Sequence, residues 1–188
     1  NVNATGAASG TLATGGITLT SATLKDVAIT GSAATVLTVN LAGATTAAAG
    51  SVTGNAASNT VFLTADAADT LNVDLGAGND VLSIGTISAT HTIDGGDGSA
   101  DTLITSAGIN ATTGANISGF EAVSAGGVTV ALPTATNTIG AVSFTGTGGT
   151  VAGVSPGATV TQAATGANTI TNTTGWTAAD DSISVSVG

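Results

Sequence analysis

The sequence has no cysteine and no methionine, and its only Lys or Arg residue is Lys25, set against eleven Asp and Glu residues. Without Cys, disulfides and thiol chemistry are excluded, which leaves a metal ion as the natural staple for a thin fold. The formal net charge of −10 disfavours binding to nucleic acid or to anionic lipid, because both need Lys and Arg. No apolar run is long enough to span a membrane, so we predict no membrane-spanning segment.

Large core residues and helix signals are also scarce. Aromatic residues make up 2% of the chain, and Ala supplies much of the 42% that is hydrophobic. Apolar residues at three- and four-residue spacing are missing, and so are most of the Glu, Lys, Gln and Arg that favour helices. These features indicate a stack of coils, each burying a few aliphatic side chains against its neighbours.

Catalysis is not expected. His91 is the only histidine, and no nucleophile-elbow pattern accompanies it. Asp180-Asp181 and Glu121 are the candidates for a glycosidase carboxylate pair, but sugar grooves usually carry aromatic residues, and Trp176 and three Phe are all there are. We predict that the protein is not an enzyme, with an extracellular β-helical polysaccharide enzyme as the least favoured alternative.

Several other residues have plain structural interpretations. We expect Asp180-Asp181 to form a solvated turn rather than a peripheral calcium site, and Trp176 to cap the stack rather than bind a partner. Pro133 and Pro156 read as turn residues. Three aromatic residues fall in strand-like runs and are predicted to be core: Phe62, Phe120 and Phe144.

Short alternating runs, separated by Gly, Asn, Ser and Asp, predict β-strands along the whole chain. Examples are 17–19, 27–29, 37–41, 61–63, 71–75, 128–132, 142–144 and 183–187. We predict an all-β parallel solenoid of the β-helix or β-roll type. It comprises irregular coils over 1–64, calcium-binding turns over 65–105 and further coils over 106–188. A β-sandwich flanking a short roll stays open. Because the chain begins with Asn1, we expect a segment of a larger protein.

A polar residue, a spacer and an aliphatic residue recur four times in the middle of the chain. The copies are Asp69-Thr70-Leu71, Asp80-Val81-Leu82, His91-Thr92-Ile93 and Asp101-Thr102-Leu103, and the aliphatic members advance by eleven, eleven and ten residues. Such a short period is typical of a coiled parallel β-structure. Seven of the eleven acids lie between Asp66 and Asp101, where a divalent cation would relieve their repulsion.

Two turns within this stretch are rich in glycine, at 76–80 and 95–101. They approximate the calcium-binding nonapeptide Gly-Gly-x-Gly-x-Asp-x-aliphatic-x, with Leu75 in place of the first glycine and Ala100 as an extra residue. The glycines permit positive φ, which lets carbonyls face an ion, and the Asp supplies a hard oxygen ligand of the kind calcium prefers. Either turn alone would be ordinary; two in phase favour calcium.

Successive turns should alternate between two edges, so the turns at 76–80 and 95–101 should share one edge. We predict that Ca²⁺ binds there, and the predicted ligands are Gly76, Gly78, Asp80, Gly96, Asp97, Gly98 and Asp101. At the opposite edge the turn ending at Asp69, a further predicted ligand, should stack on the turn ending at His91. Calcium ligates imidazole poorly, so we expect that edge to be empty or weakly bound. Asp74 and Asp94 could support the ligands or simply accept hydrogen bonds in turns.

Residues 66–123 resemble the RTX calcium-binding repeats of Gram-negative proteins exported by type I secretion. More narrowly, 92–104 followed by 117–123 looks like a recurring unit of RTX-type surface-layer proteins and large RTX adhesins. The resemblance implies calcium-dependent folding outside the cell and, for surface layers, calcium-dependent assembly.

We therefore expect a secreted, cell-surface structural segment that associates with identical subunits, with cell-surface polysaccharide as a further candidate partner. The alternative is a stalk module of an adhesin or extracellular fibre.

Overall fold

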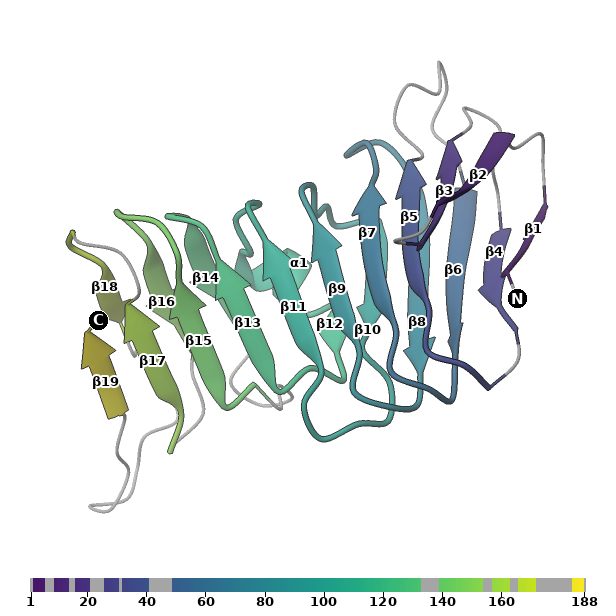
Figure 1. Ribbon diagram of the computed structural model, residues 1–188. Helices are drawn as coiled ribbons and strands as arrows, with labels where there is room; N and C mark the ends of the chain where they lie inside the picture. The colour runs from purple at the N-terminus through teal and green to yellow at the C-terminus, as the bar shows by residue number, and fades with distance from the viewer. Residues whose placement is uncertain are drawn as a thin grey trace.

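The chain folds into a β-solenoid in which parallel strands stack coil upon coil (Figure 1). The computed structural model describes residues 2–5, 9–13, 16–20, 26–30, 32–40, 49–132, 139–153, 157–162, 166–171 and 184–187. The predicted all-β parallel solenoid is confirmed. Lys25, Pro133, Pro156, Trp176 and Asp180-Asp181 lie outside the described residues.

From β3 (Gly16–Thr20) to β13 (Ala122–Ala125) the chain alternates between two stacked sheets, A and B, so that each coil there contributes one strand to each. Sheet A contains, in spatial order, β1 (Val2–Thr5), β4 (Asp26–Ile29), β6 (Ala49–Asn55), β8 (Thr70–Gly76), β10 (His91–Asp94) and β12 (Ile117–Ser118). Sheet B contains β2 (Ser9–Ala13), β3 (Gly16–Thr20), β5 (Val36–Asn40), β7 (Thr60–Thr64), β9 (Val81–Ile84), β11 (Thr102–Thr105), β13 (Ala122–Ala125), β15 (Ala141–Phe144), β17 (Thr159–Gln162) and β19 (Ser184–Val187).

A third, smaller sheet continues behind sheet B toward the C-terminal end, with β14 (Thr129–Ala131), β16 (Thr150–Ala152) and β18 (Thr169–Thr171). All strand pairs in the three sheets are parallel except the first pair of sheet A and the first pair of sheet B. There β1 runs antiparallel to β4, and β2 runs antiparallel to β3.

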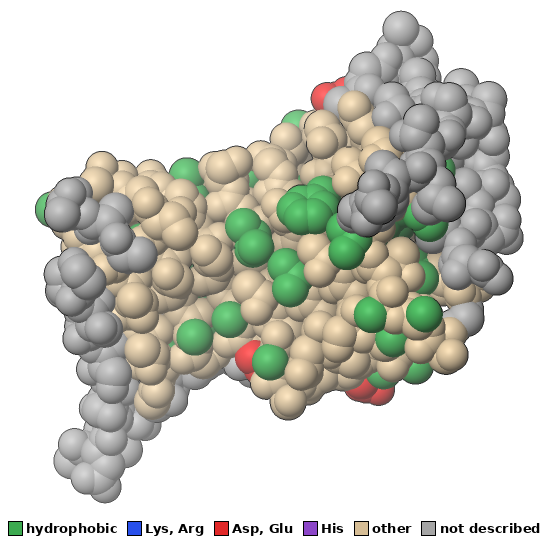
Figure 2. Space-filling view, in the orientation of Figure 1, with side chains coloured by type: hydrophobic (Ala, Val, Ile, Leu, Met, Phe, Trp, Pro, Cys, Tyr) green, Lys and Arg blue, Asp and Glu red, His purple; other side chains and the backbone are tan. Residues whose placement is uncertain are grey.

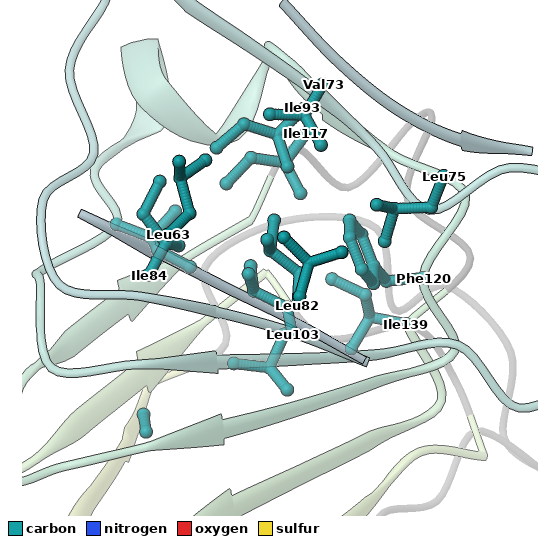
Figure 3. Close-up of a cluster of buried hydrophobic side chains, with 14 of the residues drawn as sticks. Leu63, Val73, Leu75, Leu82, Ile84, Ile93, Leu103, Ile117, Phe120 and Ile139 are labelled. Carbon is teal, nitrogen blue, oxygen red and sulfur yellow. The ribbon is translucent and has the colours of Figure 1, made fainter. Parts of the chain in front are cut away.

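The core is the narrow space between the sheets, filled by every second side chain of the strands whose side chains the structure describes. In β8 the alternation places Leu71, Val73 and Leu75 inside, each at most 1% exposed, and leaves the residues between them facing out. Side chains from both sheets and from the connecting turns meet in one cluster (Figure 3). A fully buried aliphatic side chain stabilises the fold by about 1.5–3 kcal/mol. Because every coil buries several of them, the sum over the stack takes the place of one thick core.

Where the structure describes them, the predicted runs coincide with strands, except that β14 leaves out Val128 and Leu132 of the run 128–132. Leu41 and Ile183, the ends of two other runs, lie outside the described residues. Sheet B continues without a break from β2 to β19, which leaves no place for a sandwich in the described residues.

Phe120 and Phe144 are buried, as predicted. The prediction for Phe62 was wrong, because its side chain is 44% exposed. Val61 and Leu63 occupy the inward positions of β7, so the strand's two-residue period turns Phe62 outward.

One short helix, which the sequence did not predict, interrupts the described strands. Helix α1 (Ala111–Gly114) lies in the turn between β11 and β12, where Asn110 caps it and exchanges hydrogen bonds with Thr113. Among the residues that the structure describes, no helix has the length and apolarity needed to cross a membrane.

Candidate metal site

Four corner loops stack where sheet A turns into sheet B, and we call this stack, made of residues 55–59, 76–80, 96–101 and 119–121, the glycine edge. Ala77 and Asp97 form a parallel bridge. The Gly78 N–H donates to the Asp97 carbonyl at 2.9 Å, and the Asp97 N–H donates to the Gly76 carbonyl at 2.7 Å. The two glycine-rich loops are therefore direct neighbours, as the alternation of edges predicted.

The glycines are required where these loops leave the sheet. Gly76 and Gly96 have φ of +88° and +91°, a conformation that residues with a Cβ rarely adopt. A Cβ on Gly96 would also collide with the Gly76 carbonyl of the coil below. The sequence pattern thus reflects one backbone shape used twice.

A ladder of side chains runs up the inner side of the glycine edge. Its members occupy equivalent positions, two residues before an inward aliphatic residue of sheet B, and they are Asn59, Asp80, Asp101 and Glu121. The Asn59 N–H donates to Asp80 Oδ1 at 2.6 Å, and the Asp80 N–H donates to Asp101 Oδ1 at 2.6 Å. The Asp101 N–H donates to Glu121 Oε2 at 2.8 Å. These backbone-to-side-chain hydrogen bonds therefore join each of these coils to the next.

The ladder has defined ends. Thr35 begins it by donating its N–H to Asn59 Oδ1 at 3.2 Å. The next equivalent position after Glu121 is Gly140, which has no side chain to continue it. Sequence reasoning did not assign Asn59 to the site and gave Glu121 little weight. The signal was present, since Asn59-Thr60-Val61 and Glu121-Ala122-Val123 repeat the same polar–spacer–aliphatic pattern.

The amide side chain and the carboxylate side chains of the ladder differ in how completely they are hydrogen-bonded. Asn59 uses its Nδ2 to donate to Asn55 Oδ1 at 3.0 Å and to the Ala57 carbonyl at 2.5 Å. Asp80 and Asp101 are fully buried, yet the Oδ2 atom of each has no hydrogen-bond partner. A carboxylate has no donor to offer, so these oxygens need a proton or a cation.

The surroundings of Gly98 show where one of these oxygens points. A Cβ on Gly98 would lie 2.1 Å from Asp101 Oδ2 and 2.4 Å from the Gly78 carbonyl oxygen. Both acceptors therefore pack against the Cα of Gly98, which leaves no room for a side chain at this position. Neither oxygen can satisfy the other, because both are hydrogen-bond acceptors.

The electrostatics agree with this unsatisfied state. Burial raises the pKa of Asp80, and the nearby Asp101 carboxylate adds to the rise, against a hydrogen bond from the Asn59 backbone. Burial also raises the pKa of Asp101, opposed by the Asp80 N–H and increased by the charge of Glu121. Both carboxyl groups therefore resist carrying an unneutralised charge.

The donor set fits calcium in kind. The candidate donors are oxygens only: the Oδ2 atoms of Asp80 and Asp101 and the Gly78 carbonyl oxygen. Across the described ranges no three Asp, Glu, His or Cys side chains form a metal-binding group. A bound ion would therefore complete its shell with backbone carbonyls and water, which Ca²⁺ accepts.

The remaining predicted ligands of this edge lie on its outer side. Asp97 is exposed and lines an open groove of about 530 Å³ together with Gly76, Gly96, Asp74 and Asp94. Asp74 accepts the Gly76 N–H at 3.0 Å and Asp94 accepts the Gly96 N–H at 3.1 Å, so both act as turn acceptors. No aromatic residue lines this groove, unlike the sugar groove of a polysaccharide enzyme.

Asp69 and His91 lie at the opposite corner, which we call the histidine edge, made of the turns at 65–69 and 85–91. Asp69 Oδ2 accepts the Asp66 N–H at 2.8 Å, and His91 Nδ1 accepts the Ser88 N–H at 3.4 Å. Each side chain thus caps its own turn. Both are buried, and His91 Nε2 has no hydrogen-bond partner.

The two turns of the histidine edge are neighbours, since the Thr90 hydroxyl donates to the Asp69 carbonyl at 2.5 Å. Their register differs from the repeat in the sequence, however. His91 pairs with Leu71, and Ile93 pairs with Val73. His91 therefore occupies the column of Leu71, two residues away from the position of Asp69, and the two do not form one ligand pair.

No family model, curated protein or solved structure matches the chain.

Proposed function

We propose that this chain is a calcium-stapled structural segment of a secreted, self-assembling protein of the bacterial cell surface, of the RTX surface-layer type. The observation that carries the proposal is the pair of fully buried carboxylate oxygens, Asp80 Oδ2 and Asp101 Oδ2, that have no hydrogen-bond partner. Asp101 Oδ2 lies with the Gly78 carbonyl oxygen against Gly98. A divalent cation at this place would neutralise both carboxylates and join successive coils.

Calcium would act here by coupling binding to folding. In its absence, adjacent coils bring Asp80, Asp101 and Glu121 into one column without a cation among the described residues to balance them. Binding of an ion to the folded coils alone stabilises them by mass action. At low intracellular calcium the chain would stay loose for export, and millimolar calcium outside would order it.

The architecture supports a structural role. Parallel coils with short turns make a rigid rod whose stability is a sum over neighbouring coils. The described surface is dominated by Thr, Ser, Ala and Gly, and the chain contains no Cys or Met that an extracellular environment would oxidise.

A stalk or fibre module is the second candidate, favoured by one observation. The outermost strands β18 and β19 run parallel to their neighbours, which is the geometry that another coil would extend. Many near-copies of this segment in the full gene would favour the stalk over a surface layer.

The test is calorimetric titration of the protein with CaCl₂, with MgCl₂ in parallel, followed by circular dichroism at each calcium concentration. We expect saturable calcium binding that coincides with a gain in β-structure or in melting temperature, and much weaker binding of magnesium, which prefers a rigid octahedral shell. An unchanged melting temperature when calcium is raised to millimolar concentration would contradict the proposal.

A further inference from the structure

The outer face of sheet B has an unusual distribution of apolar side chains. Three large hydrophobic residues in the described part of the chain are exposed, Val36 at 42%, Phe62 at 44% and Ile104 at 39%. All three lie on this face, on β5, β7 and β11. Figure 2 shows apolar side chains across the middle of the face and acidic side chains only at its margins.

The described outward positions of this face carry no charge. The outward positions of β5 through β17 are Thr, Ser, Val, Phe, Ile, Ala and Asn residues. The charged residues that the structure describes lie on sheet A or in the corner loops, as Asp26, Asp74, Asp97 and Glu121 illustrate. In a chain of net charge −10, a second copy meets repulsion at those surfaces and can approach closely at this one.

The face is also complementary to itself. One row across the strands reads Phe62, Ser83, Ile104, Ser124, with neighbours in direct register, so large and small side chains alternate. The next row begins with Val36 and ends with Ala141. A hollow of about 250 Å³ opens beside Ile104 and Ser124.

We propose that two copies of this chain associate through the outer faces of their B sheets, around a two-fold axis that runs along the strands between β9 and β11. This axis exchanges β9 with β11 and β7 with β13. Phe62 of one copy then faces Ser124 of the other at the rim of the hollow, Ile104 faces Ser83, and Val36 faces Ala141. Every contact occurs twice, as in an isologous dimer, and the strands stay aligned as in packed sheets.

The size of the face sets the strength of the contact. Strand spacing of about 4.8 Å and a rise of about 3.3 Å per residue give it a projected area of roughly 500 Å², below the ~800 Å² per partner of a stable complex. The pair should therefore be weak and concentration-dependent in solution, and gain strength where many copies are held together. The inference rests on the self-association in the proposed function.

The chain contains no Cys, so introduced thiols report directly on the geometry. Phe62→Cys and Ser124→Cys are made as separate single variants, mixed in equal amounts and oxidised. We expect a covalent dimer in the mixture at several times the yield of either variant alone. Within one copy these positions are three strands apart, about 14 Å, so a double variant could not form the bond internally. Phe62→Cys mixed with Thr92→Cys, on the outer face of sheet A, is the control.

Sedimentation velocity of Phe62→Ser completes the test. We expect self-association at least tenfold weaker than that of the parent, with an unchanged melting temperature because Phe62 is outside the core. A parent that self-associates without the mixed cross-link, or that stays monomeric at millimolar concentration, overturns the inference. A further outcome that rejects the dimer is a monomeric parent that binds dextran, a neutral polysaccharide, together with a Phe62→Ser variant that has lost this binding.

Calcium titration of the same variants separates the two proposals. A normal calcium response without the cross-link rejects this dimer alone, and a cross-link without any calcium response rejects the calcium staple alone.

Discussion

At the glycine edge the buried acceptors reach across to the next coil, whereas at the histidine edge they close their own turn. Asp101 accepts an N–H from Asp80, 21 residues away, while Asp69 accepts one from Asp66, three residues away. Acceptors that span coils leave Asp80 Oδ2 and Asp101 Oδ2 buried without a partner. The comparison teaches that equivalent-looking Asp residues in one repeat carry different electrostatic demands, and that a cation requirement should belong to the glycine edge alone.

The largest expected effect comes from converting the carboxylate rungs into amides. In Asp80→Asn plus Asp101→Asn, each side chain keeps its acceptor and gains a donor, as Asn59 has, so we expect the coils to form without calcium. The parent should gain roughly 5 to 10 °C in melting temperature at calcium a hundredfold above Kd, corresponding to about 2.7 kcal/mol. The double variant should lose that gain, as measured by thermal melts.

A matched control for this variant is Asp74→Asn plus Asp94→Asn, which removes the same charge from the outer groove. It should keep most of the calcium-induced gain. If calcium raises the melting temperature of the two double variants equally, calcium binds through the overall negative charge of the protein, and our assignment to Asp80 and Asp101 fails.

A methyl group at Gly98 should be the next most damaging change. Gly98→Ala places a Cβ against Asp101 Oδ2 and the Gly78 carbonyl, so we expect a loss of about 1–3 kcal/mol and weaker calcium binding. Gly140→Ala, one coil beyond Glu121 at the end of the same column, meets nothing within 4 Å and should stay within about 0.5 kcal/mol of the parent. Urea unfolding with and without calcium measures the stability of both variants. Equal losses of stability in Gly98→Ala and Gly140→Ala would contradict the special role of Gly98.

The pH dependence in the absence of calcium should follow the raised pKa of Asp80 and Asp101. A raised pKa means that the folded protein holds these protons more tightly than the unfolded chain does. The contribution of these two groups to stability is therefore fully present below their unfolded-state pKa and is lost as pH rises through the folded pKa. Calcium should reduce this loss of stability at neutral pH. The measurement is the melting temperature across pH 4 to 8, with calcium and with a chelator. A melting temperature that does not change with pH in chelator would contradict the prediction.

The smallest effect is expected at the histidine edge. In Asp69→Asn the amide oxygen can still accept the Asp66 N–H, so we expect a change of less than about 1 kcal/mol and an undiminished calcium response. A response that disappears in this variant would show that the two edges act together, contrary to the comparison above.

Much of the site was predictable because it depends on local chemistry. The two-residue alternation identified the strands, and the positions of Gly76, Gly78, Gly96 and Gly98 identified the loops. Alternation of edges then placed the turn at 76–80 beside the turn at 95–101. Asn59 and Glu121 were harder to see because neither is an aspartate, although both occupy the repeated position before an inward aliphatic residue.

The sequence by itself determined the strand period, the glycine-dependent corners and the excess of uncompensated carboxylates, because these follow from side-chain chemistry and backbone conformation. Only the tertiary structure decided which face Phe62 occupies, that His91 shares a column with Leu71, and that Asp97 lines the outer groove with Asp74 and Asp94. The physical reason is that phase and register are properties of packing. Corner lengths vary from coil to coil, and the position at which one coil meets the next is set by burying both sheets together.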